Sequence, residues 1–488
     1  MSSSEEVRSR WILGGLAVFA LAWAVTRAAV QSITIDESVT YNLFASRHLY
    51  LWFNANNHIV NSALMYGFTR LLGLSQFTAR LPALIGAAFY ISAAYRLCRL
   101  LSSSLFVQVV VFVCLVFNPF IFDYLVAARG YGLALGFLMW ALVYFTETQI
   151  QGGSLIAACA VSSACAGMSV SANFSFAFVN LAAMLAILLG AWHQRPKEKM
   201  RLLAACVLPA AIIVAIVCGY ALSQAESDQF IYGARSLRAT FGTIIEASLF
   251  ENRFTLLKPF VFPLVGVTGL PWLISLLWPT DVLVRRAKAP VARLGLAAAA
   301  IFAVTLAMHW SAFRLFGLLL PNDRTAIYFF PLFMIAAGVL AAIPPPSGLG
   351  RYLRAGFLGA LAFMAVYFLL CLRLTYFKEW YWEADMHETY AVLSCLNRDH
   401  RVTHVTSTWE YRGPLNFYQS AEPNSIEEID EGFDPQQTQV YVVDTYHSPE
   451  VLQGKNLKIF YRSPTTDLVL AASPSLADTY AAGSCLRL

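Results

Sequence analysis

Charged residues are scarce in this chain. They make up 13% of its 488 residues, whereas a soluble globular domain usually carries about 25%. Hydrophobic residues account for 58%, and the mean hydropathy is +0.58, which is typical of a protein that lies mainly in lipid. The composition therefore argues against a string of soluble domains and predicts one large membrane domain with a smaller polar part.

Common signatures of nucleotide and metal chemistry are also missing. The sequence contains no glycine-rich nucleotide loop and no zinc-finger spacing. A net charge of +5 does not indicate nucleic-acid binding, because the basic residues stand between hydrophobic runs, where membrane topology alone explains them. We therefore expect neither a nucleotide nor a nucleic acid as a partner.

Cysteine usage points in the same direction. Cys395 and Cys485 stand in the polar C-terminal region, where they could form a disulfide in an oxidising compartment or remain two free thiols. The other cysteines lie in or beside apolar segments without metal-ligand spacing, and we interpret them as packing residues: Cys98, Cys114, Cys159, Cys165, Cys206, Cys218 and Cys371.

Hydrophobic runs of membrane-spanning length recur about eleven times along the chain. The first run follows Arg8 and Arg10 as a signal peptide would, but we interpret it as an uncleaved span because the most informative motif begins directly after it. We thus predict a polytopic α-helical membrane protein with spans near 11–30, 79–100, 104–121, 124–146, 153–172, 174–192, 202–222, 256–279, 293–313, 324–344 and 354–374.

The basic residues give these spans a direction. With the N-terminus in the cytoplasm and alternating spans, the short basic loops fall on the cytoplasmic side, as the positive-inside rule requires. The long polar segments 31–78, 223–255 and 375–488 then fall on the outer side. The loops that carry this argument contain Arg195, Lys197, Lys199 and Arg201, then Arg285, Arg286, Lys288 and Arg293, then Arg351 and Arg354.

Each long polar segment has its own predicted structure. Segment 31–78 reads as two interfacial helices, near 37–49 and 58–72, while 223–255 could be a lid over a site or an inert loop. Short strands near 402–408, 439–443, 457–461 and 468–471, with a helix near 382–397, predict a small α/β domain. We therefore expect a membrane domain over 1–377 and a soluble periplasmic domain over 378–488.

The strongest local signal is the pair Asp36-Glu37, which follows the first span. Adjacent carboxylates at a membrane surface repel one another and lose hydration, so they favour a site where they bind a cation, take up a proton or meet positive groups. One of them could act as a general base. The alternative is structural: Asp36 opens a helix as its N-cap and Glu37 favours the helix dipole.

Further polar residues are predicted on the same outer side. Asn57-His58 could hydrogen-bond a phosphate or a sugar hydroxyl, or His58 could be a packed surface histidine. Arginines at span ends could bind an anion or only anchor a helix at the interface. This group comprises Arg80, Asp123 with Arg129 and Tyr131, and Arg324 with Tyr328.

In their order and their side of the membrane, these residues resemble the GT-C membrane glycosyltransferases that use polyprenyl-phosphate sugars. The likeness is greatest to the bacterial branch related to protein O-mannosyltransferases and aminoarabinose transferases, and it covers about residues 10–345. The sequence departs from that pattern at Ile59 and Gly130, where proline is common. The likeness rests on Asp36-Glu37, Asn57-His58, Ala79-Arg80-Leu81-Pro82, Ala128-Arg129-Gly130-Tyr131 and Asp323-Arg324 with Tyr328 and Pro331.

The resemblance implies a GT-C fold and glycosyl transfer on the outer face of the plasma membrane. It implies that Asp36 is the principal catalytic carboxylate, with Glu37 beside it, and that Asp123 and Arg129 support that site. It also implies that cationic side chains hold the lipid-linked phosphate, and Arg324 is our choice for that role. The implied donor is a polyprenyl-phosphate sugar, and the acceptor is a glycolipid, a cell-envelope glycan or a protein. A divalent cation at Asp36 and Glu37 is compatible with the sequence.

A transporter or lipid flippase is the alternative from another class, since it also needs many spans and intramembrane charges. Such proteins usually show internal repeats or broken helices near the bilayer midplane. The sequence shows no clear repeat, and its polar residues concentrate at one predicted face. A glycosyltransferase is therefore the favoured prediction.

Overall fold

The computed structural model describes residues 3–225, 232–250, 255–277, 290–345, 348–422, 424–432, 437–446 and 448–487. The predicted cytoplasmic basic residues Arg285, Arg286 and Lys288 lie outside the described residues, as do 226–231 and 251–254 of the predicted lid.

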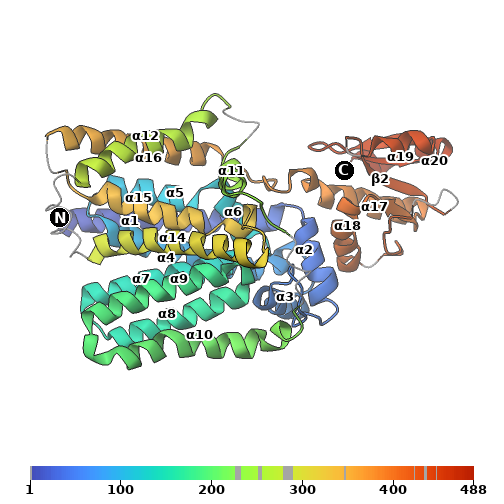
Figure 1. The fold of residues 1–488 in the computed structure, drawn as a ribbon. Coiled ribbons are helices and arrows are strands. Elements are labelled where there is room, and N and C mark those ends of the chain that lie inside the picture. The colour runs from blue at the N-terminus through green and yellow to red at the C-terminus, as the bar shows by residue number, and fades with distance from the viewer. Residues whose placement is uncertain are drawn as a thin grey trace.

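Long apolar helices run side by side through most of the molecule (Figure 1). Within the described residues, ten helices are long and apolar enough to cross a membrane, or up to eleven if one bent pair counts as a span. This confirms the predicted polytopic helical fold. The helices of these spans are α1 (Ser3–Val30), α4 (Gln76–Leu101), α7 (Tyr131–Gln151), α8 (Leu155–Ala172), α9 (Ala177–Gln194), α10 (Lys199–Leu222), α12 (Val261–Leu277), α14 (Pro290–Phe316), α15 (Phe329–Ala342) and α16 (Gly348–Leu370). The spans of α9, α10, α12 and α15 also include the 3-10 turn before the helix.

The bent pair corrects the predicted spans 104–121 and 124–146. Helix α5 (Leu105–Val116) and helix α6 (Pro119–Val126) meet at an angle of 60°. Asn118 caps α6 by accepting a hydrogen bond from the Ile121 N–H at 3.1 Å, and Pro119 occupies the first helical position, where its missing N–H costs nothing. The residues around this bend are all apolar except Asn118, so hydropathy alone does not show where one helix ends and the next begins. Asp123 consequently lies inside α6.

The polar segments gather at one end of the bundle, opposite the N-terminus (Figure 1). There α2 (Ile35–Val39), the π-helical η1 (Thr40–Ala45) and α3 (Ile59–Leu72) lie beside the C-terminal segment, and α11 (Leu237–Ala247) lies toward the same end. The predicted interfacial helices are thus present, although the first is shorter and divided. That this polar end faces outward stays a prediction.

A four-stranded sheet forms the centre of the C-terminal segment, close to where the sequence predicted strands. Its order is β1-β2-β4-β3, with β1 parallel to β2 and the other pairs antiparallel. The strands are β1 (Val405–Ser407), β2 (Val440–Asp444), β3 (Lys458–Arg462) and β4 (Leu468–Ala472), and the helices around them are α17 (Met386–His400), α18 (Trp409–Ala421), α19 (Pro449–Gly454) and α20 (Pro474–Ala481).

The C-terminal segment shares its hydrophobic core with the loop after α1. Ile33 and Met65 pack in the same buried cluster as Tyr390 and Tyr418. The Tyr418 hydroxyl also accepts a hydrogen bond from the Ile33 N–H at 2.9 Å. The C-terminal segment therefore packs on the residues that lead to Asp36. These contacts do not test whether the chain divides into two domains at 377/378, so that boundary stays a prediction.

Cys395 and Cys485 form a disulfide that joins α17 to the last turn of the described chain, across a sequence separation of 90. Of the two alternatives that the sequence left open, the structure contains the bonded form. Closing so long a loop restricts the unfolded chain, which favours the folded domain.

We expect the double variant Cys395→Ser/Cys485→Ser to destabilise the C-terminal segment by about 4.6 kcal/mol, the value that chain entropy predicts for a loop of this size. The measurement is limited proteolysis of the domain in detergent during a thermal ramp, with Cys165→Ser as the control. Non-reduced peptide mapping of the wild-type protein should yield the linked peptide, and two free thiols there would contradict the pairing.

Candidate active site

Asp36 and Glu37 stand in the first turn of α2. Thr34 is the N-cap: its hydroxyl accepts a hydrogen bond from the Glu37 N–H at 3.2 Å, and its own N–H donates to Glu37 Oε2 at 2.9 Å. Reciprocal bonds of this kind fix the start of a helix. The structural reading of the motif is therefore correct for Glu37, but Thr34 rather than Asp36 provides the cap.

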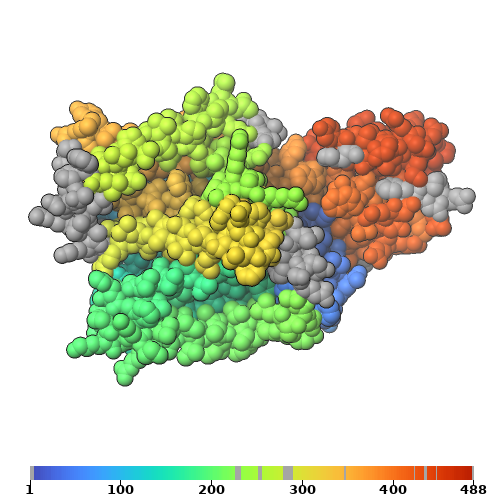
Figure 2. Space-filling view, in the orientation of Figure 1, coloured from blue at the N-terminus to red at the C-terminus, as the bar shows by residue number. Residues whose placement is uncertain are grey.

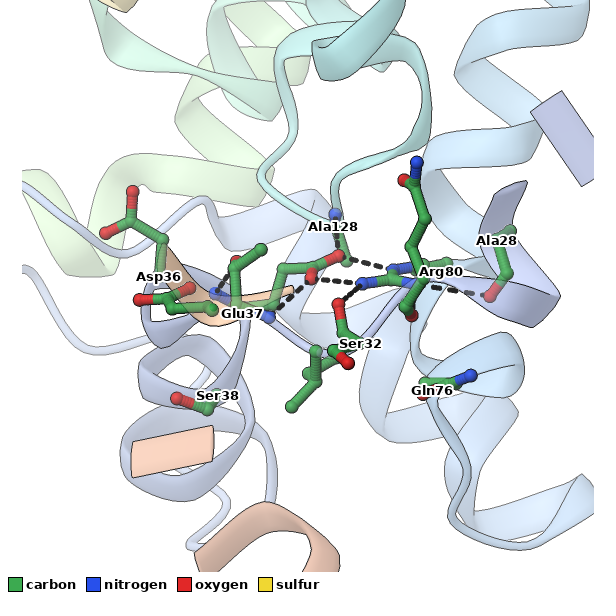
Figure 3. A network of polar contacts seen from close by, with 12 residues as sticks. Ala28, Ser32, Asp36, Glu37, Ser38, Gln76, Arg80 and Ala128 are labelled. Atoms are coloured by element: carbon green, nitrogen blue, oxygen red, sulfur yellow. Dashed lines mark hydrogen bonds and ion pairs between the residues drawn. The ribbon is translucent and has the colours of Figure 1, made fainter. Parts of the chain in front are cut away.

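Glu37 is fully engaged with Arg80 at the start of α4 (Figure 3). Arg80 Nε donates to Glu37 Oε1 at 2.8 Å and Arg80 Nη2 donates to Oε2 at 2.7 Å. The Ala128 N–H also donates to Oε1 at 2.8 Å. The other Arg80 bonds go to the carbonyls of Ala28, Gln31 and Ser32. Both side chains are completely buried, so this pair holds four segments together and does not face the site.

Asp36 meets a different environment, on the far side of Glu37 from Arg80 (Figure 3). Its carboxylate is 18% exposed and pairs with Arg324 Nη1, while Arg129 Nη2 lies 3.8 Å from Oδ1. Burial raises the pKa of Asp36, but the positive charges of Arg129 and Arg324 together with a hydrogen bond from Trp380 outweigh it and hold the pKa below its usual value. Asp36 is thus an ionised carboxylate between two guanidinium groups.

The two arginines are held by different means. Arg129 is buried, and its Nη1 donates to the Asp36 carbonyl at 3.2 Å and to Thr40 Oγ1 at 3.2 Å. Arg324 is 21% exposed, and its guanidinium lies 5.3 Å from the centre of the Tyr232 ring. Arg129 is therefore fixed in the wall of the site, whereas Arg324 is the cation that a ligand can reach.

The predicted residue Asp123 lies at the base of this arrangement. It is fully buried and accepts hydrogen bonds from Arg27 Nη2 at 2.6 Å and from Arg373 Nη2 at 2.6 Å. The N–H of Lys378 donates to its second oxygen at 2.8 Å. Asp123 thus ties α1 and α6 to the connector that follows α16.

The remaining predicted residues divide between support and site. Asn57 donates to the carbonyls of Tyr50 and Trp52 and accepts from Ser62, so it shapes the loop before α3. The Tyr328 hydroxyl lies 2.7 Å from His309 Nε2, inside the helix bundle.

His58 is buried with its ring 5.2 Å from the Tyr131 ring. Burial, and then the charges of Arg129 and Arg324, hold the pKa of His58 well below its usual value, so the imidazole is neutral.

Sequence reasoning missed the connector after α16. Trp380 hydrogen-bonds Asp36 and packs edge-on against Tyr124, with 5.4 Å between ring centres. Glu379 is beside it, and burial together with the charge of Asp323 raises its pKa to about 8. These residues lie more than 340 positions from Asp36 in the chain. The signal available was the aromatic and charged run 376–382, directly after the last span.

The carboxylate pair does not fit a divalent cation. The Glu37 oxygens are occupied by Arg80, Ala128 and Thr34, and Asp36 lies between two positive groups that would repel a metal. Elsewhere in the described chain, the one group of three potential metal ligands contains Cys395 and Cys485, which are joined by their disulfide. We derive no step through a metal.

Comparisons with known proteins give structural neighbours only. No family profile matches the sequence, and a comparison with curated proteins found no match. The structure of ArnT from Cupriavidus metallidurans bound to undecaprenyl phosphate matches with a TM-score of 0.51 and 13% identity, over 98% of this chain and 99% of that one. The same protein in the apo state gives 0.52 and 13%, over 96% and 99%.

The chain has the GT-C fold. The likeness to ArnT extends over almost the full length of both chains, so it includes the C-terminal segment as well as the helices. EmbB from Mycobacterium smegmatis matches with a TM-score of 0.41 and 17% identity, over 80% of this chain and 33% of that one. The likeness to ArnT alone confirms the fold implied by the sequence motifs.

Glu37→Gln should destabilise the protein strongly, because it leaves Arg80 as a buried, unpaired charge. Breaking a buried pair in this way typically costs 3–5 kcal/mol, that is roughly 4 kcal/mol here. Thermal unfolding in detergent is the measurement. Asp36→Asn makes the same chemical change one residue earlier at a partly exposed position, and it should retain the fold; equal melting of both variants and wild type would contradict the structural role of Glu37.

Glu379→Gln should change how stability depends on pH. The pKa of Glu379 is about 8 in the folded protein against an ordinary value of 4.5, so the folded state holds the proton more tightly and stability falls as pH rises between these values. The permanently neutral variant should lose this slope and melt above wild type beyond about pH 8, while matching it near about pH 5. Thermal unfolding across that range tests this, with the exposed Glu450→Gln as the control; parallel curves would contradict the raised pKa.

Proposed function

We propose that this protein transfers a glycosyl group from a polyprenyl-phosphate sugar to an acceptor hydroxyl or amine at the polar end of the bundle. The observation that carries the proposal is the ionised Asp36 carboxylate held between Arg129 and Arg324. A carboxylate beside accessible guanidinium groups supplies a base and an anion site within a few ångströms of each other.

Arg324 is the proposed phosphate ligand. A guanidinium binds phosphate through two parallel N–H groups, and Arg324 is the more exposed partner of Asp36. When the donor phosphate takes Arg324, Asp36 loses part of the positive charge that holds its pKa low. Donor binding therefore makes Asp36 a stronger base at the moment when a base is needed.

The reaction that follows needs no further group. The acceptor oxygen or nitrogen attacks the anomeric carbon while Asp36 accepts its proton. The bond from the anomeric carbon to the phosphate oxygen breaks, and polyprenyl phosphate leaves with the electron pair. Arg324 and the buried Arg129 stabilise the charge that develops on the leaving phosphate, in a site where little water screens them.

Glu37 and Asp123 take positioning roles in this proposal. Each is buried, and each already has arginine partners. Glu37 sets the start of α2 and so the direction of Asp36, and Asp123 holds the connector that places Trp380 against Asp36. Of the three carboxylates that the sequence predicted to be catalytic, Asp36 alone keeps that role in the proposal.

An apolar cavity in the bundle suits the lipid part of the donor. It has a volume of about 420 Å³ and lies between α12, α14, α15 and α16, with Val265, Gly269 and Phe333 in its wall. Figure 2 shows the hollow between α12 and α14. Helix α15 begins directly after the turn that carries Arg324, so an isoprenoid chain anchored there by its phosphate could follow α15 into the cavity. The bound undecaprenyl phosphate of ArnT supports this class of donor.

We also propose that the polar end faces the periplasm or the cell exterior and that the N-terminus is cytoplasmic. The Cys395–Cys485 disulfide supports an oxidising compartment for the C-terminal segment. Helix α2, which carries Asp36, lies at the end of the helix bundle opposite the N-terminus (Figure 1), which favours transfer over transport or lipid flipping. The acceptor can be a glycolipid, a cell-envelope glycan or a protein.

Asp36→Asn should abolish transfer, by at least about a hundredfold, because the amide cannot accept the proton. The test measures release of polyprenyl phosphate from purified protein supplied with polyprenyl-phosphate sugars and a cell-envelope acceptor fraction. Asp478→Asn, at an exposed carboxylate of the C-terminal segment, is the matched control and should remain active. An active Asp36→Asn variant would remove Asp36 from the mechanism, and wild-type protein that consumes no donor while moving lipid across vesicles would favour a flippase.

A further inference from the structure

Two buried polar atoms near the site, His58 Nε2 and Asn61 Oδ1, have no hydrogen-bond partner within the described part of the chain. A third, Asn173 Nδ2, meets only the Tyr131 hydroxyl, although an amide nitrogen carries two N–H donors. Their side chains are almost completely enclosed, with relative exposures of 4%, 0% and 3% for the whole residues. An unpaired buried polar atom costs about 1–3 kcal/mol, so the two unpaired atoms and the free N–H of Asn173 together indicate partners that the protein itself does not supply.

The residues that carry these atoms lie around one turn, at Ala128–Tyr131. Within it, Gly130 has a φ of +73°, and a Cβ placed there would lie 2.5 Å from the Ala172 carbonyl oxygen and 2.9 Å from His58 Cβ. The loop carrying Asn173 and the start of α3 therefore touch the same point from two sides. Asn61 joins them through its Nδ2, which donates to the Ala128 carbonyl at 2.9 Å.

The cluster adjoins the proposed phosphate ligand. Asn173 caps the short helix η2 (Phe174–Phe176), and this helix packs against η6 (Asp323–Ala326), which contains Arg324. The ring of Phe176 lies 5.2 Å from that of Tyr328, just beyond the same turn. In a polyprenyl-phosphate sugar the sugar is bonded directly to the phosphate, so its hydroxyls come next to Arg324. This position favours the donor sugar over the acceptor.

The chemistry of the cluster selects the class of sugar. Its members are two amides and an imidazole, and the imidazole is neutral because burial and two positive neighbours hold the pKa of His58 low. The charges that act on His58 are those of Arg129 and Arg324, both positive. Neutral groups that can donate and accept suit sugar hydroxyls, whereas a sugar ammonium group would be repelled by the guanidinium groups.

We infer that His58, Asn61 and Asn173 form a subsite for the hydroxyl groups of an uncharged donor sugar, which excludes cationic amino sugars as the preferred donor. The inference rests on the proposed function, since it assigns the sugar of the same lipid-linked donor. It extends that proposal to two side chains, Asn61 and Asn173, that no sequence motif indicated.

The Asn173→Asp variant tests sugar binding without disturbing the hydrogen bonds that Asn173 makes as a helix cap. The Asn173 Oδ1 accepts hydrogen bonds from the Ser175 N–H at 3.0 Å and from the Ser175 hydroxyl at 2.8 Å, and an aspartate retains that acceptor. The substitution changes only Nδ2, whose one partner in the described chain is the Tyr131 hydroxyl, into a carboxylate oxygen, which can accept a hydrogen bond from that hydroxyl. Asn456→Asp makes the same change at an exposed position of the C-terminal segment and serves as the control.

The experiment measures kcat and KM of the purified full-length protein with polyprenyl-phosphate mannose, arabinose and 4-amino-4-deoxyarabinose, alongside binding of sugar-free undecaprenyl phosphate. Wild type should prefer a neutral sugar. Asn173→Asp should raise the donor KM roughly tenfold, as expected for one lost hydrogen bond, and should shift the preference toward the amino sugar. Binding of undecaprenyl phosphate and the KM for the acceptor should not change.

Each contrary result has a distinct meaning. Wild-type preference for the amino sugar, or equal loss of sugar-free undecaprenyl phosphate binding in Asn173→Asp, would overturn the subsite. A raised acceptor KM with an unchanged donor KM would also overturn it, because the cluster would then bind the acceptor. A wild-type protein that uses no lipid-linked sugar would overturn the proposed function and the subsite together. An active wild type with an unaffected Asn173→Asp variant would overturn the subsite alone and leave the proposed function standing.

Discussion

The buried ion pair between Glu37 and Arg80 is the constraint on which the polar end of this protein depends. Neither side chain is exposed, and their hydrogen bonds join four parts of the chain: the end of α1, the start of α2, the start of α4 and the turn before Gly130. A shift of any of these segments would separate the two charges and leave each buried without a partner, which is strongly unfavourable. Because Asp36 is next to Glu37 in the chain, the ion pair also fixes the backbone position of Asp36.

A second buried ionic centre places the C-terminal segment. Asp123 binds Arg27 and Arg373 and accepts the Lys378 N–H, which brings the connector after α16 against Asp36. The sheet beyond it then packs on the loop after α1. The C-terminal segment is thus part of the site's structure, since it carries Trp380 and Glu379 to a carboxylate at the other end of the sequence.

Two neighbouring carboxylates receive opposite environments from this framework. Glu37 is satisfied and enclosed, whereas Asp36 is partly exposed and paired with Arg324, a cation that an incoming phosphate could take. Glu379 differs again, because burial raises its pKa to about 8 while that of Asp36 is lowered. Carboxyl groups whose pKa values are driven apart in one site are typical of acid–base chemistry, in keeping with transfer from a phosphate-bearing donor.

The sequence alone determined where lipid surrounds the chain, which segments are polar and where the strands of the small sheet lie, because hydropathy and alternation are local properties. It also pointed to Asp36, Arg129 and Arg324, though not to their contacts. Only the tertiary structure decided that Glu37 faces Arg80, that α5 and α6 are bent at Asn118, and that Trp380, Asn61 and Asn173 adjoin the site. The partners of a buried charge come from distant segments, so their identity depends on packing that no local pattern encodes.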